Sequence, residues 1–206
     1  MRALLTHTRT RVPRRAAVLV ASVVLAGTAA AVGQASADTS AAPRAGDFAA
    51  QARAAGLSAA QARVLQDSVD AQLALEGGTQ TAANEITLPG GVDLLVPLPG
   101  ESKARDLDAP ATRNTGTLAP PADCGSYTFC AYSGEGFTGV VKRQMRCSDT
   151  PLSIGWSGNG SWSNNQSSGT RARMYGSGGN LIYTTPGAYS EDRSGSWTPV
   201  FKVDAC

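Results

Sequence analysis

The sequence predicts an all-β protein, with an antiparallel sandwich over residues 122–206 that follows a small segment containing helix and hairpin. The first observation is that short runs suited to strands recur between glycine, proline and asparagine turns from residue 124 onward, without a helical period. The second is that all four cysteines and eleven of the twelve aromatic residues also lie from residue 124 onward, and only Phe48 lies before it. A stretch of this length and aromatic content can bury one core, which disulfide bonds would help to stabilise.

Residues 1–37 have the three parts of a secretory signal peptide. They contain five arginines and no acidic residue, and an apolar run covers residues 16–32. The small residues Ala35, Ser36 and Ala37 then supply a cleavage site. The alternative is a membrane anchor, but this Gly- and Ala-rich run is short and weakly apolar for a span of ~20 residues. We therefore expect a secreted, extracellular protein.

Removal of the signal peptide changes the charge balance and the chemistry open to the chain. The remaining 169 residues carry 13 basic and 16 acidic side chains and no histidine. A net charge near −3 without a basic stripe argues against nucleic-acid binding. Without histidine there is no Ser-His-Asp or Cys-His catalytic unit and no His-ligated zinc. We expect a monomer that is not an enzyme, needs no cofactor and binds no membrane after signal removal.

Residues 38–100 are Ala-rich and are expected to be an accessory segment or a pro-region. Ser58 and Gln61 match a capping box, in which each side chain satisfies a backbone N–H of the other residue. Apolar residues follow at i,i+4 spacing, and Gly77-Gly78 is predicted to end this helix. A second helix is predicted over residues 47–55.

Two short strands are predicted in the same segment, over residues 85–88 and 92–96. The segment has too little apolar surface for a core of its own, so we expect it to dock elsewhere, to be removed or to stay partly mobile. Residues 101–121 are predicted to form a linker, because they are polar and contain several prolines.

The C-terminal region contains five runs that read as strands. They cover residues 128–132, 139–145, 171–175, 181–184 and 200–203. The alternative is a loop-rich disulfide knot, although four cysteines are few for such a scaffold. Lys142, Arg143 and Arg146 form a small basic group in or beside the second run, and we expect them on a solvated strand face.

One motif refines the fold. Residues 132–139 place Tyr132 and Phe137 five apart, with Gly139 two residues after the second aromatic. A hairpin that folds back over its sheet needs aromatic cover and a glycine where φ is positive. The motif resembles the Greek-key motif of βγ-crystallins, and a degenerate second copy starts at Tyr175 but has Asn180 near the place of the expected aromatic. The resemblance implies a βγ-crystallin-like double Greek-key sandwich.

Residues 124–134 resemble the opening of the Streptomyces metalloproteinase inhibitor family, which consists of small secreted actinobacterial proteins with this fold. A C-x5-C spacing followed by Tyr-Ser-Gly carries the resemblance, and residues 164–170 leading into Tyr175 are similar to many members. The resemblance covers about residues 122–206. It implies a peptidase inhibitor whose partner is a secreted protease, most directly a metalloprotease, and whose rigid loops act without a catalytic group.

Four cysteines allow three pairings. The family resemblance implies that Cys124 pairs with Cys130, which leaves Cys147 to pair with Cys206. Free thiols and a four-cysteine zinc site are the alternatives, and the irregular spacing without C-x-x-C disfavours zinc. The family also holds its inhibitory loop in a small disulfide ring, for which this chain has no close cysteine pair after Tyr175. The domain can therefore keep the fold and lack the inhibitory activity.

The candidate inhibitory loop follows Tyr175, where the family has its inhibitory segment. It consists of Gly178, Gly179, Asn180, Leu181 and Ile182. Leu181 and Ile182 suit the loop, because thermolysin-like clefts accept bulky apolar residues after the scissile bond. The alternative is that these two residues begin a core strand.

Two rival functions depend on other residues. Asn164, Asn165 and Ser168 partly fit the calcium loop of microbial βγ-crystallins, since carboxamide and carbonyl oxygens suit a hard cation. The two leading positions carry no charge, and Gly169 replaces the final serine, so we expect weak or absent calcium binding in a non-inhibitory structural protein. The second rival is a cell-wall or carbohydrate-binding, toxin-like protein with a stacking platform. Its candidate residues are Trp156, Trp162 and Trp197, for which core packing is the simpler interpretation.

Overall fold

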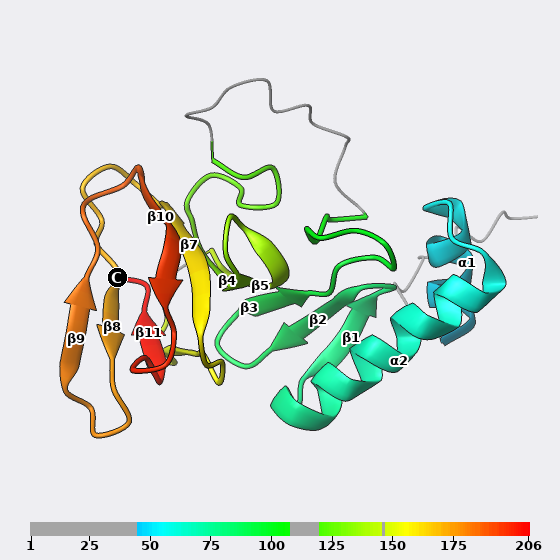
Figure 1. Cartoon of the computed structure of the whole chain (residues 1–206), viewed down its shortest axis with the longest axis horizontal. Helices are drawn as coiled ribbons and strands as arrows, with labels where there is room; N and C mark the ends of the chain where they lie inside the picture. The colour runs from blue at the N-terminus through cyan, green and yellow to red at the C-terminus, as the bar shows by residue number, and fades with distance from the viewer. Residues whose placement is uncertain (1–44, 108–119, 146) are drawn as a thin grey trace, which may run out of the picture. The chain divides into compact units, whose positions relative to one another are not determined.

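The computed structural model describes residues 45–107, 120–145 and 147–206, so the predicted signal peptide, most of the predicted linker and Arg146 lie outside it. The described residues are mostly β, with two antiparallel sheets and two helices (Figure 1), which confirms the predicted all-β class. The helices are α1 (Ala45–Ala54) and α2 (Ala59–Glu76). The strands are β1 (Thr79–Ala82), β2 (Glu85–Leu88), β3 (Val92–Leu95), β4 (Thr128–Gly134), β5 (Thr138–Gln144), β6 (Leu152–Ser153), β7 (Asn159–Asn165), β8 (Arg173–Tyr175), β9 (Leu181–Thr184), β10 (Ser190–Ser196) and β11 (Lys202–Asp204).

Helix α2 begins and ends as its sequence predicts. The Ser58 hydroxyl accepts a hydrogen bond from the Gln61 backbone N–H (3.3 Å), and the Gln61 side chain accepts one from the Ser58 N–H (3.0 Å). At the other end Gly77 has a φ of 73°, and its N–H donates to the Leu73 carbonyl (2.9 Å). These bonds satisfy backbone groups that have no partner within the helix.

The seven-stranded sheet joins the two parts of the chain. Its strand order is β1-β2-β3-β5-β4-β7-β10. Strand β3 pairs antiparallel with β5, from Val92 opposite Gln144 to Leu95 opposite Val141. The predicted hairpin of β2 and β3 therefore extends the sheet of the C-terminal region (Figure 1), and the upstream segment docks by strand pairing.

Strands β4 to β7 and β8 to β11 form two consecutive units with the same arrangement. The first unit has the order β5-β4-β7, and the second has the order β9-β8-β11. The third strand of each unit lies in the sheet of the other unit, since β6 pairs with β11 and β10 pairs with β7. This exchange ties the two sheets together.

Three apolar clusters hold these layers. The first combines residues of both sheets, among them Phe129, Trp162, Met174, Trp197 and Val203. The second is built by the upstream segment, which corrects the expectation that this segment has too little apolar surface. Its buried members are Phe48, Ala52, Leu65, Val69, Ala83, Ile86, Leu94, Val96 and Leu98. The third joins upstream and C-terminal residues around the first disulfide, namely Leu95, Ala104, Cys124, Cys130, Tyr132, Phe137 and Val141.

Candidate functional site

The predicted inhibitory loop lies in the hairpin that connects β8 to β9. Residues 178–180 belong to its turn, which is closed by hydrogen bonds from the Gly176 N–H to the Asn180 carbonyl (2.9 Å) and from the Gly179 N–H to the Gly176 carbonyl (2.9 Å). Gly179 has a φ of 78°, which glycine adopts without steric cost. The hairpin therefore forms even though Asn180 stands where the motif expects an aromatic residue.

The other two residues of the predicted loop, Leu181 and Ile182, are the first residues of β9. Strand β9 lies at the edge of the four-stranded sheet, whose order is β6-β11-β8-β9. The exposed fraction is 55% for Leu181 and 40% for Ile182. The alternative interpretation is that these two residues begin a core strand. They do begin a strand, but they do not lie in the core. Leu181 lies opposite Tyr175, and Tyr175 lies opposite Lys202, whose ammonium group is 5.8 Å from the ring centroid.

The base of this hairpin is tied to the strand that the second disulfide anchors. Arg173 of β8 donates a hydrogen bond to the Cys206 carbonyl and forms an ion pair with Asp204 (3.3 Å). Cys206 is in turn bonded to Cys147. The hairpin thus has a neighbouring disulfide at its base instead of a small ring within its own loop.

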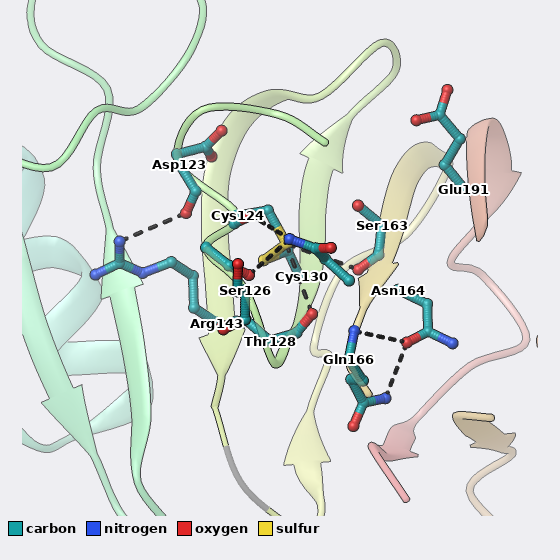
Figure 2. Close-up of a disulfide and its surroundings, with 12 residues drawn as sticks. Asp123, Cys124, Ser126, Thr128, Cys130, Arg143, Ser163, Asn164, Gln166 and Glu191 are labelled. Atoms are coloured by element: carbon teal, nitrogen blue, oxygen red, sulfur yellow. Dashed lines mark hydrogen bonds between the residues drawn. A yellow bond between two sulfur atoms is a disulfide. The ribbon is translucent and has the colours of Figure 1, made fainter. Parts of the chain in front are cut away.

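Both disulfides join the predicted cysteines. The Cα atoms are 5.9 Å apart in Cys124–Cys130 and 5.5 Å apart in Cys147–Cys206. Figure 2 shows the first bond next to Arg143, whose side chain donates to the Asp123 carbonyl (3.5 Å). Because such bonds persist in oxidising surroundings, they indicate an extracellular or otherwise oxidising environment.

The hairpin between β4 and β5 has the features that its motif predicts. The rings of Tyr132 and Phe137 are buried and meet edge to face with centroids 5.3 Å apart. The Phe137 N–H donates to the Ser161 hydroxyl (2.8 Å). Gly139 has a φ of 79°, and a Cβ atom there would lie 2.2 Å from the Ser133 hydroxyl oxygen. Gly139 is therefore required both by its backbone conformation and by a close approach.

The calcium candidates have other partners in the structure. Asn164 is fully buried, and its amide nitrogen donates to two backbone carbonyls (2.9 and 3.2 Å). Its amide oxygen accepts hydrogen bonds from Gln166 (Figure 2). Asn165 donates to the Cys124 carbonyl (3.0 Å), and Ser168 lies in an isolated β-bridge. Within the described ranges, no group of three or more His, Cys, Asp or Glu residues is placed to hold a metal ion.

The three tryptophans do not form an exposed platform. Trp162 and Trp197 are buried, and Trp156 is partly buried and packs against Trp197 with ring centroids 6.1 Å apart. The Trp197 indole N–H donates to the Tyr132 carbonyl (2.7 Å). These contacts support the interpretation of the tryptophans as core residues.

Of the two basic residues of β5, Lys142 is buried and Arg143 is largely covered, with 13% of its side chain exposed, which corrects their expected position on a solvated face. Lys142 is fully buried, and its ammonium group donates to Glu76 of α2 (2.7 Å). Burial lowers the pKa of Lys142, and the ion pair with Glu76 acts in the opposite direction. Arg143 forms ion pairs with Glu85 (3.2 Å) and Asp106 (3.1 Å). Nothing in the local sequence of β5 reveals these partners, because they come from the upstream segment.

Two exposed aromatic residues near the hairpin were not among the predicted site residues. Tyr183 of β9 is 44% exposed, and its ring centroid lies 6.1 Å from that of Trp162. Phe201 is 56% exposed, and its N–H donates to the Tyr175 carbonyl (2.8 Å). Both lie in runs that the sequence predicts as strands. The exposure of Tyr183 follows only from the edge position of β9 in the strand order, and Phe201 lies just before the interior strand β11.

Comparison of this chain with protein-family models, with curated proteins and with solved structures found no match. The family resemblance therefore stays a prediction from its motifs. Neither α1 nor α2, the helices of the described part of the chain, is long and apolar enough to cross a membrane.

Proposed function

We propose that this chain is a secreted peptidase inhibitor directed at metalloproteases, with a βγ-crystallin-like double Greek-key scaffold. Two observations support the scaffold. The two four-strand units repeat one strand order and exchange their third strands, as two interlocked Greek-key units would. The glycine and aromatic pair of the first hairpin also occupy the positions that the motif requires.

The observation that carries the function is the presentation of Leu181. This apolar side chain is more than half exposed at the end of a hydrogen-bonded turn, on a hairpin anchored at its base. An inhibitor that already has its bound conformation loses little entropy on binding, which favours a tight complex. Such inhibition needs no catalytic group, which agrees with the lack of histidine after residue 37.

The direct test is titration of the secreted chain against a thermolysin-like metalloprotease. We expect stoichiometric inhibition by the natural sequence. Leu181→Asp places a charge where an apolar pocket is expected, and we expect it to raise Ki by about 100-fold, which corresponds to ~2.7 kcal/mol.

Leu75→Asp is the matched control, because Leu75 of α2 is another exposed leucine, far from the hairpin in sequence. It should leave Ki unchanged. An absence of inhibition at micromolar concentrations of the natural chain would contradict the proposed function.

A further inference from the structure

The hairpin that we propose as inhibitory has exposed apolar side chains on both of its faces. Leu181 lies directly opposite Tyr175, so it shares the face of Tyr175 and Lys202. Phe201 precedes Lys202 by one residue and therefore points to the other face. Tyr183 belongs to that second face too, because it lies opposite the buried Met174.

Ile182 extends the second face. It has no partner residue on β8, because the register shifts between Met174 and Tyr175. A Cβ atom on Gly176 would lie 3.3 Å from the Ile182 Cδ1 atom. Successive residues of a strand point to opposite faces, so a side chain at position 176 would lie on the face opposite the Tyr175 side chain. The Asn180 and Ile182 side chains therefore both lie over Gly176, on the same face as Phe201.

Strand β9 differs from the other three sheet edges in its chemistry. Strand β10 carries Glu191, Asp192 and Arg193, strand β1 has the sequence Thr-Gln-Thr-Ala, and strand β6 has two residues. Charge, polarity and shortness are the usual protections of an open edge. Strand β9 (Figure 1, orange) has the sequence Leu-Ile-Tyr-Thr, and its first three residues are exposed. An apolar, uncharged edge of this kind marks an interaction surface.

A second copy of the chain does not suit this surface. Leu181, Ile182, Tyr183 and Phe201 are each only about half exposed, so together they offer roughly 400 Å², about half of the ~800 Å² per partner of a standard interface. These side chains also lie on two opposite faces of the hairpin. The sheet of a second copy, packed against the edge or against one face, would leave the apolar side chains of the other face in water. Tyr183 packs against Trp162 of the seven-stranded sheet, so the second face is open mainly near the turn, at Ile182 and Phe201. A cleft that closes on both faces of the hairpin near its glycine-rich turn covers Leu181, Ile182 and Phe201 and adds contact area.

We infer that the β8–β9 hairpin enters a two-walled, apolar cleft of its partner protease. Leu181 contacts one wall, and Ile182 and Phe201 contact the other. This inference rests on the proposed function and adds to it the geometry of the partner and two further contact residues. It makes inhibition depend on side chains of both faces.

The test measures Ki against the same thermolysin-like metalloprotease for single variants of the secreted chain. Ile182→Ser and Phe201→Ser should each raise Ki by about tenfold, and Leu75→Ser should leave it unchanged. Thermal unfolding of each variant checks that the chain is folded. The two variants alter different strands, so the test does not depend on the folding of either one alone.

The outcomes separate the inference from the proposed function. If Leu181→Asp raises Ki while Ile182→Ser and Phe201→Ser do not, the contact is one-sided and only the inference is overturned. If the natural chain does not inhibit the protease, both are overturned. Sedimentation that showed a dimer at micromolar concentration, dissociated by Phe201→Ser, would overturn the inference in favour of a second copy.

Discussion

Residues 45–107 and 120–206 share one sheet but are held by different interactions. The C-terminal region contains both disulfides and eleven of the twelve aromatic residues. The upstream region has no cysteine, and it contributes the acidic partners of the buried Lys142 and the largely covered Arg143. Both disulfides lie within residues 124–206, so neither of them joins the two regions. The comparison indicates that the disulfide-rich region relies on the upstream region for charge neutralisation.

The strongest test of this dependence is removal of the upstream region. A chain of residues 120–206 loses the strand next to β5 and leaves Lys142 and Arg143 without their acidic partners. The fragment also loses Leu95 from the cluster around the first disulfide. Loss of one buried leucine side chain costs about 2–5 kcal/mol, against a total stability of about 5–15 kcal/mol for a domain. We expect this fragment to lack a cooperative thermal unfolding transition under conditions where residues 38–206 show one. An equal melting temperature for both chains would show that the regions are independent.

The disulfides provide the next largest effect. Cys147–Cys206 spans 59 residues in sequence and Cys124–Cys130 spans 6. Chain entropy then predicts losses of about 4 and about 2 kcal/mol when each pair is replaced by alanine. Urea unfolding of each variant can be followed by Trp fluorescence, which reports the C-terminal region, and by helix circular dichroism, which reports the upstream region. If the regions form one cooperative unit, each replacement should lower the urea midpoints of both signals by the same amount. Separate transitions for the two signals would divide the molecule into two folding units.

The Lys142–Glu76 ion pair tests the contact between the regions directly. Glu76→Gln leaves a fully buried ammonium group without its carboxylate, and we expect a loss of about 3 kcal/mol in urea unfolding. Lys142→Met removes the buried charge itself and should cost less. Glu101→Gln is the control, because its ion pair with Arg105 is exposed and should contribute less than about 1 kcal/mol. Equal effects of Glu76→Gln and Glu101→Gln would show that this buried pair does not hold the regions together.

A smaller effect concerns Asp123, at the start of the C-terminal region. Burial raises the pKa of this carboxyl group, and the nearby Arg143 only partly opposes the shift. Because the folded pKa lies above the unfolded value, the stabilising contribution is complete below about pH 4 and is lost as the pH rises through the folded pKa. Asp123→Asn does not titrate, so its stability relative to the natural chain should increase from about pH 4 to pH 7. A difference in unfolding free energy that stays constant over this range would contradict the assignment.

Several elements of the fold could be predicted because their signals are local. The capping box of Ser58 and Gln61, the hairpin of β2 and β3, and the glycine at position 139 all act over a few residues. Strands β7 and β10 were missed, because their sequences Asn-Gly-Ser-Trp-Ser-Asn-Asn and Ser-Glu-Asp-Arg-Ser-Gly-Ser lack apolar alternation. Ser161 and Asn164 are nevertheless buried in β7, where Ser161 accepts a hydrogen bond from the Phe137 N–H and Asn164 donates one to the Thr170 carbonyl. Local composition does not reveal such long-range partners.

The candidate site could be predicted only in part for the same reason. The candidate loop is selected only by its place after Tyr175 in the motif. The disulfide pairing is implied by the family resemblance, and the structure confirms it. Whether Leu181 is exposed depends on β9 lying at a sheet edge, which is a property of the complete strand order. Phe201 joins the hairpin surface through pairing between β11 and β8, and its own neighbours in sequence give no sign of this.

The position of β11 also determines when the sandwich can close. This strand lies between β6 and β8, although it is encoded after both of them. A chain made from its N-terminus therefore carries β6 and β8 without their shared neighbour until residues 202–204 have been synthesised. At about 5–20 residues per second, the roughly 50 residues between β6 and β11 take several seconds to appear. During that time the growing chain remains open, and the four-stranded sheet forms only after residues 202–204 are free to pair.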